Sequence, residues 1–89
     1  MAWKIEFDPA ALKELHKLDK SVKRRILKFL HERVVKLADP RQIGAGLQGT
    51  LSGLWKYRVG DYRLICSLEN DRFVVLVLRI GHRREIYSR

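Results

Sequence analysis

Residues 55–65 read WKYRVGDYRLI, and this stretch decides the fold. Aromatic and aliphatic side chains at positions 55, 57 and 59 alternate with Lys56 and Arg58, which is the period of a strand with one buried face. The Gly-Asp pair that follows has the composition of a two-residue hairpin turn. With such a turn, Arg58 lies directly across from Arg63 on the returning strand. The stretch therefore predicts an antiparallel hairpin whose outer face is basic.

Arg58 and Arg63 are expected to repel each other on this hairpin, because like charges directly opposite on adjacent strands destabilise a sheet. A local rule that is broken without visible compensation indicates a functional site. A bound phosphate would supply the compensation. The alternative is that both guanidinium groups spread into water and hold no ligand.

The sequence after the hairpin turn predicts one more long strand. The returning strand, residues 62–69, ends at an Asn-Asp pair at 70 and 71 that also has turn composition. Residues 73–80 are apolar on both faces, so this strand should be central and covered on both sides. A short extended piece at residues 85–87 follows.

The sequence before the hairpin predicts one strand and two helices. Residues 3–7 alternate in the strand period, and Asp8-Pro9 then supplies an N-cap and a proline at the first helical position. Leucines at positions 12, 15 and 18 form the apolar stripe of a short first helix. The second helix is expected to run to about residue 38, where Asp39-Pro40 ends it. Residues 40–54 should form a loop whose leucines dock on the core.

The resulting order of elements is β-α-α-β-β-β. It indicates an α+β fold in which a helical hairpin packs on a small, mostly antiparallel sheet. The 89 residues leave no room for a second unit, so residues 1–89 are expected to form a single domain.

The charge is the most informative part of the composition. Nineteen Lys and Arg against ten Asp and Glu give a net charge of +9, and such a field on a small domain attracts polyanions. A second basic group, His82, Arg83 and Arg84, precedes Tyr87. Cations and an aromatic ring around one face are the groups that hold an RNA backbone and stack a base. The alternatives are an acidic protein partner and a face that is simply solvated.

Other site chemistries find no support in the sequence. The single cysteine, Cys66, allows no internal disulfide and is expected in the core. No spacing of His, Cys and Asp suggests a metal site, so neither a metal nor a cofactor is expected. The glycines of residues 40–54 lack the Lys-Ser/Thr ending of a P-loop. Neither a signal peptide nor an apolar run of bilayer length is present, so a cytoplasmic protein without a membrane partner is expected.

Three blocks of the sequence resemble the RelE/ParE superfamily of bacterial toxins. Residues 47–65, with the pattern LxGxLxGLWKYRVGDYRLI, are similar to the central block of that family. Residues 81–87, GHRREIY, look like its C-terminal block, and residues 8–15, DPAALKEL, resemble its first helix. The resemblance covers nearly the whole chain, and YRVGDYR is its most specific part.

The RelE branch of the family implies a ribosome-dependent endoribonuclease that cleaves mRNA in the ribosomal A site. In the implied reaction, a ribose 2′-hydroxyl attacks the adjacent phosphate without a metal and leaves a 2′,3′-cyclic phosphate. The resemblance implies a catalytic set of five residues: Lys56 as candidate base, Arg58 beside it, Arg63 and Arg83 on the phosphate, and Tyr87 to orient or stack the nucleotide. His82 is a second candidate acid or base, and the residues expected to bind nucleic acid are Lys56, Arg58, Arg63, His82, Arg83 and Arg84.

The resemblance also implies partners. A cognate antitoxin would neutralise the toxin, the ribosome and mRNA would be its targets, and operator DNA would be contacted only through the antitoxin complex. Two other functions stay open: a ParE-like toxin that inhibits DNA gyrase without nuclease activity, and a binding module that only represses its own operon. All three would share one fold, so the fold does not decide between them.

Overall fold

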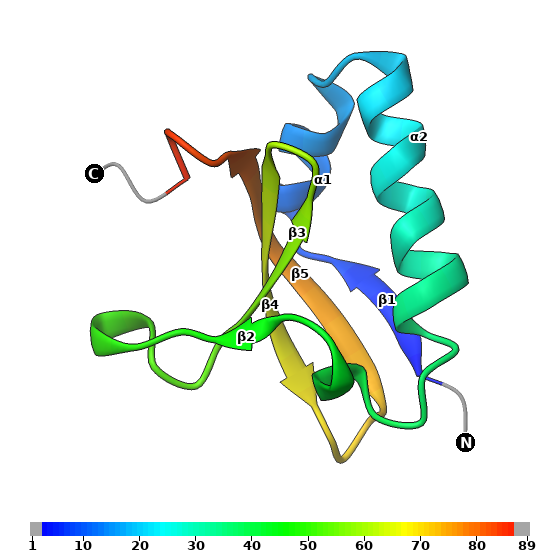
Figure 1. Ribbon diagram of the computed structural model, residues 1–89, viewed down its shortest axis with the longest axis vertical. Coiled ribbons are helices and arrows are strands. Elements are labelled where there is room, and N and C mark those ends of the chain that lie inside the picture. Colours follow the sequence, from blue (N-terminus) through cyan, green and yellow to red (C-terminus); the bar gives the residue numbers. More distant parts are fainter. Residues whose placement is uncertain (1–2, 87–89) are drawn as a thin grey trace.

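The parallel pairing of the first and last strands sets the architecture of the computed structural model, which describes residues 3–86 (Figure 1). β1 (Lys4–Phe7) lies beside β5 (Val74–His82). The sheet continues through β4 (Tyr62–Glu69) and β3 (Trp55–Val59) to the short edge strand β2 (Ala45–Gly46), in the order β1-β5-β4-β3-β2. Every pair except β1–β5 is antiparallel. The predicted α+β class, with a mostly antiparallel sheet, is confirmed.

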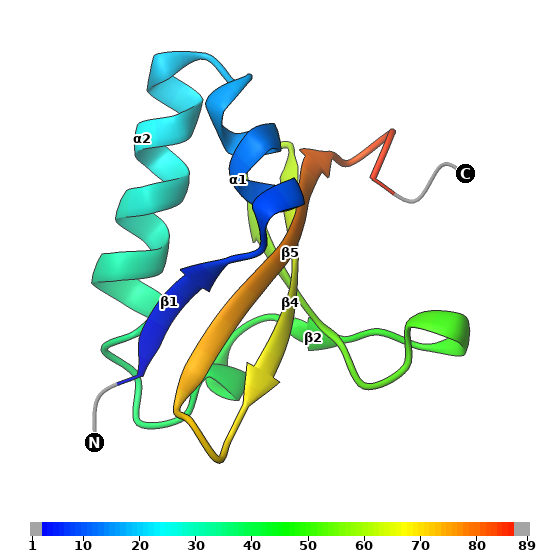
Figure 2. The ribbon, with the colours of Figure 1, turned by 180° about the vertical axis from the view of Figure 1, so that it is seen from behind.

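Two helices connect β1 to the rest of the sheet, and they form the predicted hairpin (Figures 1 and 2). α1 (Pro9–His16) begins as expected, because the Asp8 carboxylate accepts a hydrogen bond of 3.0 Å from the backbone N–H of Ala10. α2 (Lys20–Phe29) returns beside it. The expectation that Leu12 belongs to the apolar stripe is wrong, since this side chain is 41% exposed. Leu15 is buried as predicted, and Ala11 is buried in place of Leu12, which lies one helical position away from that face.

α2 continues into a π-helical segment, Leu30–Val34, which is closed by a hydrogen bond of 3.1 Å from Val35 N–H to the Leu30 carbonyl. Ile26, Leu30 and Val34 are all fully buried. Their strict four-residue repeat is longer than the 3.6-residue turn of an α-helix, and the widened turn keeps Val34 above the sheet. The helical region therefore ends at Val34 instead of near residue 38.

Glu14 links α1 to the part of β5 that β1 does not reach, where β4 is the only strand of the described sheet beside β5. β1 pairs with β5 only as far as Val77. Beyond that point, Glu14 Oε1 accepts a hydrogen bond of 2.8 Å from the backbone N–H of Ile80, and Oε2 accepts one of 3.3 Å from Arg79 Nε. The carboxylate thus takes the place of a strand partner for the Ile80 N–H.

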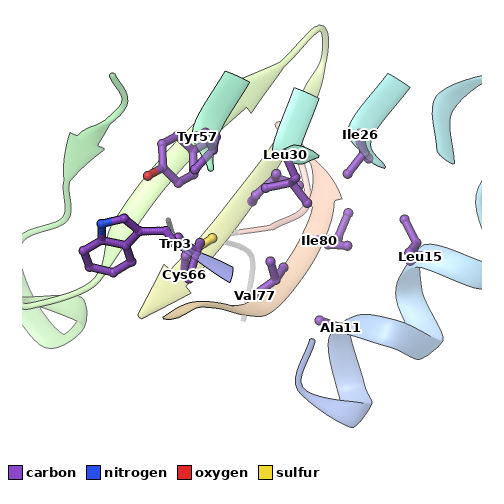
Figure 3. Close-up of a cluster of buried hydrophobic side chains, with 12 residues drawn as sticks. Trp3, Ala11, Leu15, Ile26, Leu30, Tyr57, Cys66, Val77 and Ile80 are labelled. Atoms are coloured by element: carbon purple, nitrogen blue, oxygen red, sulfur yellow. The ribbon is translucent and has the colours of Figure 1, made fainter. Parts of the chain in front are cut away.

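The core lies between the helical hairpin and one face of the sheet (Figure 3). Tyr57 is its largest fully buried side chain. Cys66 is buried there too, as predicted. Burial raises the pKa of the Cys66 thiol to about 12, so the group remains neutral at physiological pH.

The segment between the helices and β3 is more ordered than the predicted loop. It contains two short 3₁₀ turns, Pro40–Gln42 and Gly49–Leu51, and the edge strand β2 between them. The part between β2 and β3 projects away from the helices (Figures 1 and 2). Leu47, Leu51 and Leu54 are half-buried and do not join the core. The expectation that they dock there is wrong, since none of the three packs against the cluster between the helices and the sheet. Leu51 and Leu54 instead line a groove with other apolar side chains, among them Ile65, Leu78 and Ile86.

The β4–β5 connection and the chain after β5 also differ from expectation. The predicted two-residue turn is a four-residue connection over residues 70–73, in which Phe73 has a positive φ of 54°. Arg72 within it forms ion pairs with Glu69 and Glu6, at 2.7 and 3.0 Å. β5 is an interior strand as predicted, but β4 occupies the middle of the sheet. The extended piece predicted from residue 85 is instead a turn, because Ile86 N–H donates to the His82 carbonyl at 2.9 Å.

Candidate functional site

The β3–β4 hairpin positions three of the candidate residues. Gly60, with a φ of 60°, and Asp61 make the predicted two-residue turn. The register confirms that Arg58 lies directly across from Arg63. Lys56 precedes Arg58 by two residues on β3, so it projects from the same face of the sheet.

The Arg63 guanidinium turns back toward the hairpin turn. Its Nη1 donates hydrogen bonds of 3.2 Å to the Gly60 and Tyr62 carbonyls. Two carbonyl oxygens thus face the Arg63 charge, a compensation that the sequence did not predict. These bonds also fix the direction of the side chain before any ligand arrives.

Arg83 reaches the same hairpin tip from the chain that follows β5. Its backbone N–H donates to the Asp61 carbonyl at 2.8 Å, and its Nε lies 3.9 Å from Asp61 Oδ1. Arg63 and Arg83 are thus both anchored to the β3–β4 turn, although they are far apart in sequence. The Arg83 side chain remains half-exposed and accessible to a ligand.

A cavity of about 380 Å³ opens beside β3, within the range of roughly 300–1,000 Å³ usual for ligand sites. Lys56, Arg58 and Arg63 line it together, and Arg33 from the π-helical segment adds a fourth cation. Its remaining lining is apolar or backbone, without a carboxylate, and consists of Phe29, Ile43, Gly44, Ala45 and Tyr57. The cavity therefore suits an anionic ligand.

One wall of this cavity is the segment before β2, which two hydrogen bonds and a close backbone approach hold against β3. Trp55 Nε1 donates to the Ile43 carbonyl at 2.8 Å, and the Tyr57 hydroxyl donates to the Pro40 carbonyl at 2.7 Å. Gly44 has a φ of 84°, and a Cβ placed on it would lie 2.5 Å from the Lys56 carbonyl oxygen. Only glycine allows this close approach. Desolvation by burial raises the pKa of Tyr57 far above its ordinary value, so its hydroxyl stays a hydrogen-bond donor.

His82, Arg83 and Arg84 lie outside the lining of this cavity. His82 pairs with Tyr62 across β4 and β5, and the two rings meet edge to face with centroids 5.7 Å apart. Tyr62 packs against the core, so His82 is on the helix side of the sheet, whereas Arg63 projects from the other side. His82 Nδ1 accepts a hydrogen bond of 3.2 Å from the Arg84 backbone N–H. Tyr87, the predicted stacking residue, lies outside the described residues.

Sequence reasoning missed Phe29 and Arg33 as site residues. The two are four residues apart, which places them side by side on a helical surface and could have indicated their contact. The Arg33 guanidinium carbon lies 5.7 Å from the centre of the Phe29 ring. Nothing in the sequence indicated that this pair faces the cationic surface of the β3–β4 hairpin.

In the described part of the chain, the helices are too short or too polar to cross a lipid bilayer. Within residues 3–86, no group of three or more His, Cys, Asp and Glu side chains is placed to hold a metal ion.

Comparison with known proteins identifies relatives along nearly the whole chain. Residues 5–87 match the family described as the ParE toxin of the type II toxin–antitoxin system parDE. The chain is 29% identical to toxin RelG of Mycobacterium tuberculosis, with all of both chains covered. It is 35% identical to the mRNA interferase toxin RelE of Escherichia coli K12, covering 99% of this chain and 93% of that one.

Solved structures agree with the sequence matches. The RelBE2 toxin–antitoxin complex of M. tuberculosis contains a chain that superposes with a TM-score of 0.84 at 26% identity, covering 93% of this chain and all of that one. A double mutant of free E. coli RelE gives a TM-score of 0.75 at 28% identity, covering 97% of this chain and 88% of that one. The chain therefore belongs to the RelE/ParE superfamily of toxins of type II toxin–antitoxin systems.

Proposed function

We propose that this toxin is an endoribonuclease that cleaves mRNA in the ribosomal A site without a metal ion. The observation that carries the proposal is the single cavity that gathers Lys56, Arg58 and Arg63 and has no carboxylate in its lining. Such a surface favours a phosphate over a cationic or neutral ligand. The E. coli relative, 35% identical, is named an mRNA interferase, which supports the same activity.

The proposed reaction uses the chain's own cations. Lys56, the proposed base, takes the proton of a ribose 2′-hydroxyl while that oxygen forms a bond to the adjacent phosphorus. Arg58 and Arg63 donate hydrogen bonds to the phosphorane oxygens, for which planar, permanently charged guanidinium groups are suited. The bond from phosphorus to the 5′-oxygen then breaks, and the leaving oxygen takes up a proton. The products are a 2′,3′-cyclic phosphate and a 5′-hydroxyl.

Arg83 and Tyr87 complete the proposed catalytic set. Arg83, held at the hairpin tip by Asp61, would contact the phosphate from the tip of the hairpin, whereas Lys56 would contact it from further along β3. Tyr87 would orient the nucleotide. His82 is the weaker candidate for the base: with Nδ1 accepting from Arg84 N–H, a neutral imidazole carries its proton on Nε2, which makes the ring a donor.

The proposed dependence on the ribosome follows from the small number of catalytic side chains in the site. In-line attack by a 2′-hydroxyl needs an aligned backbone, and alignment by a bound partner accounts for a large part of such rate enhancements. The test is cleavage of one mRNA by purified toxin, free in solution and on programmed ribosomes. Fast cleavage on ribosomes and little on free RNA is expected, and rapid cleavage of free RNA would refute ribosome dependence. Absence of cleavage in both, with loss of DNA gyrase activity, would identify the ParE-like alternative.

A cognate antitoxin is the proposed protein partner. The net charge of +9 calls for an acidic segment that folds on the toxin surface. The solved relatives include complexes of RelE with RelB antitoxins from M. tuberculosis and E. coli, which supports this partner. Operator DNA would be reached only through the complex. Expression without the neighbouring gene should arrest growth, and a toxin that is harmless without it would contradict the proposal.

A further inference from the structure

Arg33 carries a positively charged group that the proposed reaction does not use. It belongs to the π-helical segment Leu30–Val34, and it lines the same cavity as Lys56, Arg58 and Arg63. Within residues 3–86, its guanidinium has no hydrogen bond or ion pair, and its recorded contact is the Phe29 ring. Its five N–H donors are therefore available to a ligand.

Packed rings position the Phe29 face beneath this guanidinium. Tyr57 is fully buried and its hydroxyl is bonded to Pro40, so the ring is fixed. Phe29 meets the Tyr57 ring edge to face, with centroids 5.8 Å apart, and Arg33 lies over Phe29. A guanidinium that rests on an aromatic face keeps its N–H edge free for an anion and loses less side-chain entropy on binding.

The free edge of β3 connects Arg33 to the hairpin cations. β2 pairs only with Trp55 and Lys56, so beyond Lys56 no described strand covers this edge. A second cavity, of about 280 Å³, lies on the helix side and is lined by Arg25, Lys28, Phe29, Glu32, Arg33 and Val59. Phe29 and Arg33 line both cavities. Cations therefore line both sides of the β3 edge, from the hairpin to α2, with Glu32 as the single carboxylate in the lining on the helix side.

We propose that Arg33, whose guanidinium lies over the Phe29 ring, is a second phosphate-binding position that holds the RNA backbone one step away from the scissile phosphate. The inference rests on the proposed ribonuclease function and adds a subsite to it. Arg33 binds and positions the RNA and takes no part in proton transfer. The widened π turn contributes, because an extra residue in a helical turn changes the direction in which the following side chains project.

The test compares Arg33→Ala with Lys36→Ala, which removes a neighbouring exposed cation that lines neither cavity. Affinity is measured on programmed ribosomes carrying mRNA with a 2′-O-methyl group at the cleavage site, which blocks the attack. Cleavage of unmodified mRNA is measured in parallel at saturating toxin. Arg33→Ala should weaken binding by about 10-fold or more, the equivalent of one charge-assisted hydrogen bond. The slope of log affinity against log salt should fall by about 0.7, the value for one phosphate of a single strand.

The saturating cleavage rate of Arg33→Ala should stay close to that of the wild type, and Lys36→Ala should match the wild type in all three measurements. Arg33→Lys keeps the charge but not the planar guanidinium, and should fall between wild type and Arg33→Ala. Thermal unfolding of each variant verifies the fold.

Equal binding by Arg33→Ala and Lys36→Ala would overturn the inference while leaving the ribonuclease function intact. Unchanged RNA binding with weakened antitoxin binding would overturn it in favour of a protein contact. A loss confined to the saturating rate would overturn it as well, since it would place Arg33 in the chemical step. A wild type that cleaves no RNA would instead refute the ribonuclease function itself.

Discussion

Replacing Arg63 with alanine separates phosphate binding from folding. The substitution removes two hydrogen bonds of 3.2 Å from Nη1 to the Gly60 and Tyr62 carbonyls. At this length and exposure each contributes about 0.5 kcal/mol, the low end of the usual range. The same change removes the repulsion with Arg58 across the hairpin, which costs roughly 0.2–1 kcal/mol. The free energy of unfolding should therefore change by no more than about 1 kcal/mol, or roughly 4–8 °C in Tm.

The activity should respond far more strongly than the stability. Loss of one donor to a developing anion lowers a catalytic rate by about 100-fold or more, which corresponds to about 2.7 kcal/mol of transition-state stabilisation. Single-turnover cleavage on programmed ribosomes measures the rate, and thermal unfolding of the same preparation measures the stability. Lys20→Ala is the matched control, because Lys20 is an exposed cation on α2 that lines a separate cavity.

Two outcomes would refute the reasoning. If Arg63→Ala unfolds or loses much more stability than the two hydrogen bonds allow, the residue is structural and the site lies elsewhere. If the variant is folded, toxic and cleaves at the wild-type rate, Arg63 does not hold the phosphate, and the gyrase-directed alternative gains support.

Four further predictions concern residues that stabilise the fold around the site. Glu14→Ala should lower the free energy of unfolding by about 1–3 kcal/mol, because it leaves the Ile80 N–H without an acceptor, whereas Glu14→Gln keeps an acceptor and should cost less in the same denaturant titration. Gly44→Ala should destabilise the protein more than Gly49→Ala, since both glycines have positive φ but only Gly44 has heavy atoms within 4 Å of the added Cβ; equal losses would refute the close contact. Tyr57→Phe should cost about 1 kcal/mol through the lost bond to Pro40, and an unchanged Tm would contradict it. The folded-state pKa of Cys66, about 12, lies above the unfolded value near 8.5. The contribution of this thiol to stability is therefore complete below pH 8.5 and declines as the pH rises toward 12. Alkylation of Cys66 at pH 8 should require unfolding, and rapid labelling of the native protein would disprove the burial of Cys66.

The alternation in residues 55–65 was sufficient to predict the β3–β4 hairpin and the pairing of Arg58 with Arg63. Local rules sufficed because strand period and turn composition are properties of neighbouring residues. Asp8 as the N-cap of α1 was predictable for the same reason. The β2 strand was not, since two residues, one of them glycine, carry no strand period and pair only because Gly44 allows the chain to approach β3.

The candidate site was predictable in part. The cations of β3 and β4 followed from the hairpin, but the hydrogen bonds of Arg63 depend on side-chain directions that the sequence does not specify. Arg33 enters the cavity because α2 and its π turn lie against β3. That placement depends on packing between segments far apart in the chain, which periodicity cannot reveal.

The parallel pairing of β1 with β5 also orders events during synthesis. Lys4 pairs with Val74, so β1 cannot pair until about 70 more residues have been synthesised. That takes roughly 4–14 s at ordinary elongation rates of about 5–20 residues per second. The α1–α2 hairpin can form from local contacts in that interval, whereas closing the sheet requires the most distant contact in the fold. Arg83 follows β5 and reaches the hairpin tip only after β5 has joined the sheet. A nascent chain therefore carries an incomplete cationic site until the last step of its own folding.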